Sequence, residues 1–499
     1  MKFLSIILLG LCLVSCSDFL EEEVYTSINP DEYYKNENQV KAAINAAYSR
    51  FQDPNYYDHQ IFLIADMSTD MLDTRWRNNV YNNYSTDKGH NEYRPFWEAA
   101  WKTNNAINGV IERSPAANMN ADLKARIIGE AKFLRALNYF NLVRIYGRVP
   151  LILDFITDLN DDIYPASATY EVIYNQIITD LKDAEEVLPW SYDAADTGRA
   201  TKGAAKSLLG KVYLTLAGYH LDATSSSLVK GDPSYYQLAV DKLNEVINEK
   251  VYDLFDSYGD NFRNETENGV EHIFSIQYKQ GALGPGGWGG EGSTKQTRWA
   301  PKAGITHTAY ETFRADRSFY ASFDAADKRK EVIYLDQYVD ANNVEQSYPE
   351  TLQYPYVKKY IRDIHEGDDT NYSTASGMDG EENTEVIRYA DVLLMHSEAL
   401  AEVAEQVTEE ALMSINKVRE RAGLDKYEVA DFASLETFRT SIINEREWEL
   451  CYEGHGWFDY TRMGILEERV AKASLKFYYW PIPNIEITKN SNLLQSPGW

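Results

Sequence analysis

The amino-acid sequence predicts a mostly α-helical protein built from consecutive helix pairs. Apolar residues recur at helical spacing in long segments, most clearly in residues 200–217, where Ala204, Leu208, Val212 and Leu216 follow one another at every fourth position. Residues that end helices follow several of these segments. The expected helices span residues 96–112, 123–146, 170–188, 200–217, 235–249, 386–403, 409–421 and 435–452.

Glycine and proline set the predicted helix ends. Gly147 follows residues 123–146, and Gly423 lies shortly after residues 409–421. Glycine readily adopts the left-handed conformation that closes many helices. Pro189 directly follows residues 170–188 and cannot continue a helix, because it has no N–H to donate.

The helix pairs match the tetratricopeptide repeat pattern in part. Leu209-Gly210-x-x-Tyr213 fits its first helix, and Ala239 with Leu243 can begin its second after an insertion. Residues 388–421 form another pair of nearly the ~34-residue period. We expect Gly210 to lie where two helices approach closely. Stacked pairs form a superhelical array with a concave surface, although this partial match leaves other helical arrangements open.

Two irregular segments interrupt the helices. Residues 260–310 contain a strand-like run at 272–276, followed by a glycine-rich stretch at 281–290 that cannot be helical. Residues 365–385 form a polar, acidic loop. Long loops on a rigid scaffold are where binding usually resides.

The amino terminus predicts export. A positive Lys2 precedes an apolar run at residues 3–14, which is a signal peptide pattern and is shorter than the roughly 20 residues of a spanning helix. Leu13-Val14-Ser15-Cys16 resembles the bacterial lipobox, so we expect residues 1–15 to be removed and Cys16 to be acylated. Two or three acyl chains anchor firmly at about 0.8 kcal/mol per methylene. Residues 16–27 would form a polar lipidated tether; an ordinary secretory signal is the alternative.

Composition excludes several classes of function. Besides Cys16, the chain has only Cys12 and Cys451, so no disulfide framework exists, and Cys451 is expected to be a small buried apolar residue. The net charge of -28 argues against binding nucleic acid or an anionic membrane surface. The 37 Tyr and 10 Trp suit amphipathic ligands at partly exposed sites, although most of these rings must pack helices.

No catalytic or metal motif is complete. His365-Glu366 lacks the second histidine of a zinc protease, and the loop at residues 198–203 has Ala204 where a phosphate loop needs lysine. The eight histidines have no metal-ligand spacing, and the acidic stretches at 158–162 and 368–369 lack a calcium-loop pattern. We therefore expect no enzyme, cofactor or metal centre, although carboxylate pairs at glycosidase spacing cannot be judged from sequence.

Several segments together resemble one family. They are residues 130–140, 201–205, 387–395, 415–423, 445–454 (with Glu445-Arg446-x-x-Glu449-Leu450), 481–483 and 495–499. They are similar to the SusD/RagB-like outer-membrane lipoproteins of Bacteroidetes, which feed glycans or other nutrients to a TonB-dependent transporter. Two positions depart from the family pattern: Gly456 follows His455 where the family usually has arginine, and Ser496 replaces an asparagine.

The resemblance implies both an architecture and a role. Residues 28–499 would form a single unit, in which tetratricopeptide-like helix pairs make an α-α superhelical scaffold for an irregular, loop-rich ligand-binding half, with loops at about 55–95 and 255–385. The role would be capture of an oligosaccharide at the outer membrane, facing the exterior, for delivery to a SusC-like TonB-dependent transporter.

The resemblance also suggests candidate binding residues in two segments. In the family's glycan binders, aromatic rings stack on sugar faces while Arg, Asp and Asn bond to hydroxyls. The candidates here are Asp73, Arg75, Trp76, Arg77, Asn78 and Tyr81 in the first segment, and Trp288, Arg298 and Trp299 in the second. Packing or a solvated loop is the alternative for each residue. Capture of a non-glycan nutrient such as a peptide, an extracellular glycoside hydrolase and a protein-binding helical scaffold stay open.

Overall fold

A computed structural model describes residues 33–74, 79–90, 92–157, 164–222, 225–279, 295, 313–339, 344–361 and 380–499. It confirms the mostly α-helical prediction, because the strands of the described part form only short two-stranded antiparallel sheets. The expected signal peptide, Cys16 and tether lie outside these residues. No helix of the described part is long and apolar enough to cross a membrane.

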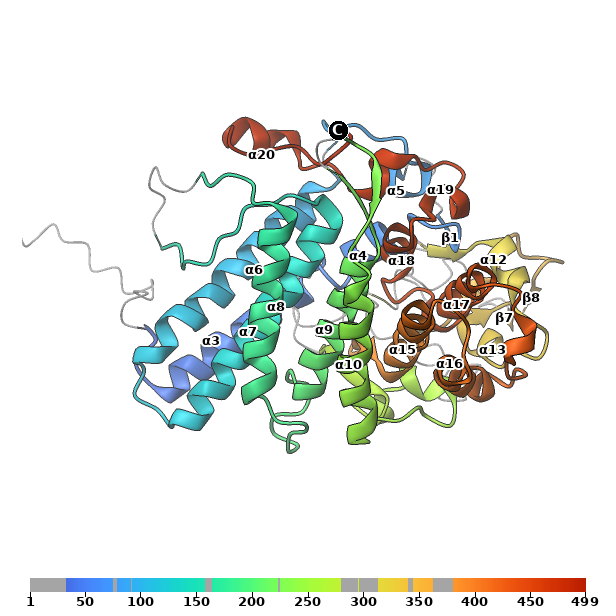
Figure 1. Cartoon of the computed structure of the whole chain (residues 1–499), viewed down its shortest axis with the longest axis horizontal. Coiled ribbons are helices and arrows are strands. Elements are labelled where there is room, and N and C mark those ends of the chain that lie inside the picture. Colours follow the sequence, from blue (N-terminus) through green and yellow to red (C-terminus); the bar gives the residue numbers. More distant parts are fainter. Residues whose placement is uncertain are drawn as a thin grey trace, which may run out of the picture.

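Long helices stand side by side and form the predicted array of pairs (Figure 1). Neighbours in sequence pack on one another from α6 to α10, and α10 then packs on α15, which contacts α16 and α17. The array comprises α6 (Arg94–Arg113), α7 (Ala121–Tyr146), α8 (Tyr170–Val187), α9 (Lys202–Ala217), α10 (Ser234–Glu249), α15 (Tyr389–Ala404), α16 (Glu409–Ala422) and α17 (Leu435–Leu450).

Shorter elements connect and cover this array. The shorter helices are α3 (Glu37–Ser49), α4 (Gln60–Ala65), α5 (Val80–Asn83), α12 (Arg317–Ser322), α13 (Arg329–Ile333), α18 (Gly456–Met463), α19 (Leu466–Arg469) and α20 (Asn484–Lys489). The paired strands are β1 (Leu72–Thr74) with β5 (Phe313–Ala315), β2 (Tyr219–Leu221) with β3 (Leu228–Lys230), β4 (His272–Ile276) with β10 (Thr384–Arg388), β6 (Tyr334–Leu335) with β9 (Tyr356–Val357), and β7 (Gln337–Val339) with β8 (Glu345–Ser347).

Local sequence signals explain the helix boundaries. Helix α7 ends at Gly147, and α16 ends at Gly423, whose φ of +80° lies in the left-handed region. One predicted boundary was wrong: residues 386–388, expected to begin a helix, belong to strand β10. Ile387 and Arg388 pair with Phe274 and His272 of β4, and this tertiary contact overrides the helical spacing.

Two further expectations are confirmed inside the scaffold. A Cβ atom on Gly210 would lie 2.7 Å from Cδ2 of Leu243, so glycine lets α9 and α10 approach closely. Cys451 is buried, and burial raises the pKa of its thiol to about 12. Such a thiol is protonated at neutral pH and behaves as a small apolar residue.

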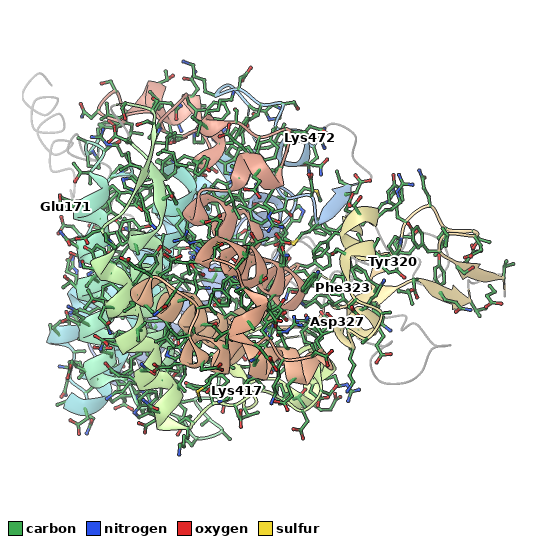
Figure 2. The ribbon with its side chains drawn as sticks, turned by 45° about the vertical axis from the view of Figure 1, so that its right-hand side comes forward. Glu171, Tyr320, Phe323, Asp327, Lys417 and Lys472 are labelled. Atoms are coloured by element: carbon green, nitrogen blue, oxygen red, sulfur yellow. The ribbon has the colours of Figure 1, made fainter. Side chains whose placement is uncertain are left out.

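A buried ion-pair network joins β10, α13 and α17. Arg388 donates to Glu453 Oε2 at 2.7 Å and to Glu271 Oε1 at 2.5 Å, and Arg329 donates to Glu445 Oε1 at 2.7 Å. We call this the junction network; it comprises Arg329, Arg388, Arg421, Lys359, Asp327, Glu271, Glu445, Glu449 and Glu453, all buried or nearly so. It ties the helical array to the irregular half. Figure 2 shows Tyr320, Phe323 and Asp327 where residues 313–339 adjoin the C-terminal helices.

Candidate functional site

One strand of the first predicted segment pairs with a strand that follows the second. Strand β1 (Figure 1) belongs to the first segment, and its partner β5 lies C-terminal to the second, whose candidate residues are outside the described residues. Their antiparallel register places Asp73 opposite Arg314. Because directly opposed residues of a strand pair project to the same face, these two side chains are neighbours.

Buried and half-buried residues alternate along this strand pair, and the charged residues are the half-buried ones. Leu72, Thr74, Phe313 and Ala315 are buried, whereas Asp73 and Arg314 are half-buried. The apolar residues therefore attach the pair to the core. We call the outward group of Asp73, Arg314, Arg317 and Tyr354 the ledge.

One tyrosine ring holds both guanidinium groups of the ledge. The Cζ atom of Arg314 lies 5.1 Å from the Tyr354 ring centroid, and that of Arg317 lies 5.4 Å from it. Such cation–π contacts contribute about 0.5–1 kcal/mol at exposed sites. The ring thereby restricts two long side chains and presents their N–H groups at the surface.

Within the described residues, no ion pair links the charged side chains of the ledge to one another. Asp73 accepts the N–H of Thr74 at 2.7 Å, but it forms no ion pair with Arg314. Arg317 is exposed and pairs with no carboxylate of the described chain. Asp316 caps helix α12 and accepts the N–H of Ser318 at 2.7 Å. Arg317 thus offers donors, and Asp73 offers an acceptor, to a polar ligand.

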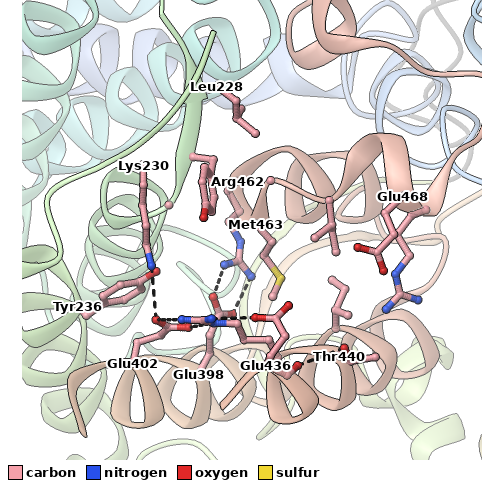
Figure 3. Close-up of a pocket in the computed structure, with 17 residues that line it drawn as sticks. Leu228, Lys230, Tyr236, Glu398, Glu402, Glu436, Thr440, Arg462, Met463 and Glu468 are labelled. Atoms are coloured by element: carbon pink, nitrogen blue, oxygen red, sulfur yellow. Dashed lines mark hydrogen bonds and ion pairs between the residues drawn. The ribbon is translucent and has the colours of Figure 1, made fainter. Parts of the chain in front are cut away.

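A pocket of about 410 Å³ between the β2–β3 hairpin and α10, α15, α17 and α18 has the opposite character (Figure 3). Arg462 binds both carboxylate oxygens of Glu398, at 2.5 and 2.9 Å. Arg439 binds both oxygens of Glu402, at 2.5 and 2.8 Å, and Lys230 lies 3.8 Å from the same carboxylate. We call this the charged pocket. A ligand there would have to replace ion pairs that are already formed.

Comparisons with known proteins agree on one family. A family model described as "Starch-binding associating with outer membrane" matches residues 18–214, and one described as "SusD family" matches residues 306–499. The chain belongs to the SusD-like family. The resemblance read from the sequence is therefore confirmed.

Relatives of this SusD-like chain match it over nearly its full length. SusD-like protein P2 of Formosa agariphila is 28% identical, with 99% of each chain covered. A SusD superfamily protein from Parabacteroides distasonis has a TM-score of 0.76 at 25% identity, covering 93% of this chain and 99% of its own. A laminarin-binding SusD-like protein has a TM-score of 0.75 at 26% identity, covering 93% and 100%.

The predicted site residues have three different outcomes in the structure. Asp73 lies on the ledge, whereas Arg75, Trp76, Arg77, Asn78, Trp288, Arg298 and Trp299 lie outside the described residues. Tyr81 requires a correction, because its side chain is fully buried in the core. Its ring meets Trp480 edge-on at 4.9 Å, and its hydroxyl donates to the Glu92 carbonyl at 3.0 Å. This tyrosine packs the SusD-like core instead of facing a ligand.

Sequence reasoning missed Arg314, Arg317 and Tyr354. No local pattern marks them, because Asp73 and Arg314 become neighbours only when β1 in the N-terminal half pairs with β5 in the C-terminal half of the chain. The only available signal was position, since Arg314 and Arg317 directly follow the long irregular segment at 260–310. Loops that follow such a segment are plausible binding elements, but contact between them requires the fold.

Two neighbouring buried acids of the SusD-like chain have divergent pKa values. Burial raises the pKa of Asp66 to about 8, with only partial compensation by the Gly454 N–H. Burial would also raise the pKa of Glu453, but Arg388 and Lys359 outweigh it and lower that pKa to about 2. Both carboxylates are at least 96% buried, and the cavity beside Glu453 has a volume of only about 20 Å³, so packing accounts for this divergence. Among the described residues, no group of three or more His, Cys, Asp or Glu could hold a metal ion.

Proposed function

We propose that this chain captures oligosaccharides at the cell surface and delivers them to a SusC-like TonB-dependent transporter. The observation that carries this proposal is the ledge, where Asp73 and Arg314 of the β1–β5 pair lie near Arg317 of α12 and one tyrosine ring contacts both guanidinium groups. Capture without chemical change requires only such a preorganised polar surface.

The chemistry of the ledge suits sugar hydroxyls. A hydroxyl both donates and accepts hydrogen bonds. The exposed Arg317 side chain supplies N–H donors, the carboxylate of Asp73 supplies an acceptor, and Arg314 lies opposite Asp73 on the paired strand. Rings for the apolar faces of the sugar would come from Trp76, which follows β1 in sequence, and from Trp288 and Trp299, with Arg75, Arg77, Asn78 and Arg298 as further polar groups.

The comparisons support a glycan as the ligand class. One family model is described as starch-binding, and a relative of the same fold at 26% identity is named a laminarin-binding protein. The same family model is described as associating with the outer membrane. Capture of a non-glycan nutrient such as a peptide is the second candidate, since it requires the same scaffold and differs only in the binding segments.

A lipid on Cys16 would hold the protein at the outer membrane, facing the exterior. The lipobox-like Leu13-Val14-Ser15-Cys16 supports this part of the proposal. We expect Cys16→Ser to move the protein from the membrane fraction to the soluble fraction on cell fractionation. Unchanged membrane association of this variant would refute the anchor.

Calorimetry against a glycan panel tests the binding proposal. We expect one or more glycans to bind without being cleaved, and the Arg314→Ala/Arg317→Ala variant to bind about 10-fold or more weakly, since hydrogen bonds from charged groups contribute about 1.5–3 kcal/mol. Arg94→Ala/Lys426→Ala is a matched control that removes two surface cations elsewhere. Equal affinity of the ledge variant and the control would exclude the ledge, and binding of peptides alone would favour the second candidate.

A further inference from the structure

A separate pocket of about 330 Å³ lies at the connection between α8 and α9. Its walls come from residues 190–192, 197–199 and 201, from Val251 and Tyr252, and from residues 268–270 and 272–275, which lead into β4; the structure describes all of them. We call it the α8–α9 pocket. In Figure 1 this connection lies at the lower end of the helical array, whereas β1 of the ledge lies at the upper right.

Aromatic rings in fixed positions line the α8–α9 pocket. Trp190 and Tyr192 are half-buried, and Tyr252 is nearly buried. The hydroxyl of Tyr192 donates to the Ala200 carbonyl at 2.9 Å, and the hydroxyls of Tyr252 and Thr201 share a hydrogen bond of 2.9 Å. Because these rings are held before any ligand arrives, binding to them costs little ordering entropy.

The α8–α9 pocket offers no free charge. Its lining contains no Asp or Glu, and each of the three guanidinium nitrogens of its one arginine, Arg199, already donates a hydrogen bond. The Arg199 guanidinium donates to Asp196 at 2.7 Å, to Glu130 at 3.1 Å and to Asn45 at 2.8 Å. His272 is also engaged, with one ring nitrogen 3.0 Å from the Asn261 carbonyl.

The remaining polar groups are neutral and available. Within the described chain, the indole N–H of Trp190 and the hydroxyl of Ser191 have no hydrogen-bond partner, and both residues line the pocket. Flat apolar faces beside uncharged donors and acceptors match a molecule with C–H faces and hydroxyls. The volume lies at the lower end of the range of about 300–1,000 Å³ that is typical of small-molecule sites.

We infer that the α8–α9 pocket is a second saccharide site, selective for neutral sugar units. A sugar ring packs against Trp190 and Tyr192, and its hydroxyls bond to the Trp190 N–H and the Ser191 hydroxyl. This site is independent of the ledge, which presents charged groups on a different side of the molecule. A polysaccharide long enough to reach both sites would bind more tightly than a short fragment, through the raised effective concentration at the second site.

Saturation-transfer difference NMR with cellotetraose, laminaritetraose, maltotetraose and xylotetraose tests this site. The measurements use the full mature chain carrying Arg314→Ala/Arg317→Ala, so that the ledge is disabled. We expect saturation transfer to at least one of these neutral sugars. Adding Trp190→Ala should reduce it at least 5-fold, while adding Trp101→Ala, which removes another half-buried tryptophan, should leave it unchanged.

A second variant keeps the test decisive if Trp190→Ala does not fold. Val270 lines the pocket and is 41% exposed, so Val270→Trp fills the opening without removing a core side chain. Loss of transfer in this variant supports the site. Absence of transfer to all four sugars, or equal transfer with and without Val270→Trp, would overturn it. Failure of the ledge proposal gives a different result, because the ledge substitutions alone would then leave affinity unchanged.

Discussion

The junction network and the ledge are both rich in charge, but they use it in opposite ways. In the junction network, Arg388 meets Glu271, Glu449 and Glu453 in the interior, and every cation has a carboxylate partner. At the ledge, Arg317 is exposed and rests on a tyrosine ring without a carboxylate partner in the described chain. Charged residues therefore point to a binding surface only where their partners are missing from the chain itself.

The same comparison separates the ledge from the charged pocket. The charged pocket has a larger volume than the α8–α9 pocket and many ionisable side chains, yet Arg439 and Arg462 each already hold a carboxylate through two hydrogen bonds. Bidentate pairs of this kind are among the strongest in proteins. Hollow shape and charge alone therefore do not show that a surface is available to a ligand.

Removing a cation from the junction network should have the largest effect. Arg388→Ala removes a buried cation that contacts Glu271, Glu449 and Glu453 and leaves three buried carboxylates with less compensating charge, so we expect the free energy of unfolding to fall by about 3–5 kcal/mol. Denaturant titration measures this change. Lys426→Ala, which breaks an exposed ion pair with Glu420, is the control and should cost less than about 1 kcal/mol. Similar losses in the two variants would show that burial does not distinguish them.

The second-largest expected effect is a loss of unfolding free energy at low pH, through the junction network. The folded pKa of Glu453, about 2, lies below its unfolded value, so the stability it contributes is present above about pH 4.5 and is lost as pH falls towards 2. The contribution is about 3 kcal/mol, at 1.36 kcal/mol per pKa unit. We expect Glu453→Gln to show a correspondingly shallower decline in unfolding free energy between pH 5 and pH 2.5. An identical slope would contradict this assignment.

Asp66 is the opposite case to Glu453, because its pKa is raised and not lowered. Burial raises its pKa to about 8, so it is mostly protonated at neutral pH. The unfolded chain loses this proton near pH 4, so the wild type should lose stability as pH rises from about 4 to 8. Asp66→Asn should cost less than about 1 kcal/mol at pH 7 and should be relatively more favourable at pH 8.5. A large loss at pH 7 would show that a charged carboxylate is required there.

Substitution at the ledge should affect stability least. Arg317 is exposed and makes only a ring contact, so Arg317→Ala should change the unfolding free energy by less than about 0.5 kcal/mol. The same variant should nevertheless weaken glycan binding. Thermal denaturation and calorimetry on one preparation measure both effects. A loss of stability as large as that of Arg388→Ala would place Arg317 in the scaffold.

The scaffold could be predicted from sequence because its signals are local. Helical spacing, Gly210 and the stops at Gly147 and Gly423 act within a few residues, and each has its expected place in the structure. The ledge could be predicted only as two separate segments. Strand β1 is three residues long, and only its pairing with β5 brings Asp73 beside Arg314.

Local sequence patterns also could not predict which side chains are buried. Tyr81 stands in a polar stretch of the first predicted segment, yet it faces inward against Tyr93 and Trp480. A tyrosine has both an apolar ring and a polar hydroxyl, so its sequence context fits a core position and a surface position equally well.

A crystal structure of the protein with the tightest-binding glycan of the panel tests the central claim most directly. The ledge account predicts a sugar within hydrogen-bond distance of Asp73 and of Arg314 or Arg317. A sugar bound in the charged pocket, with the ledge empty at saturating ligand, would contradict it.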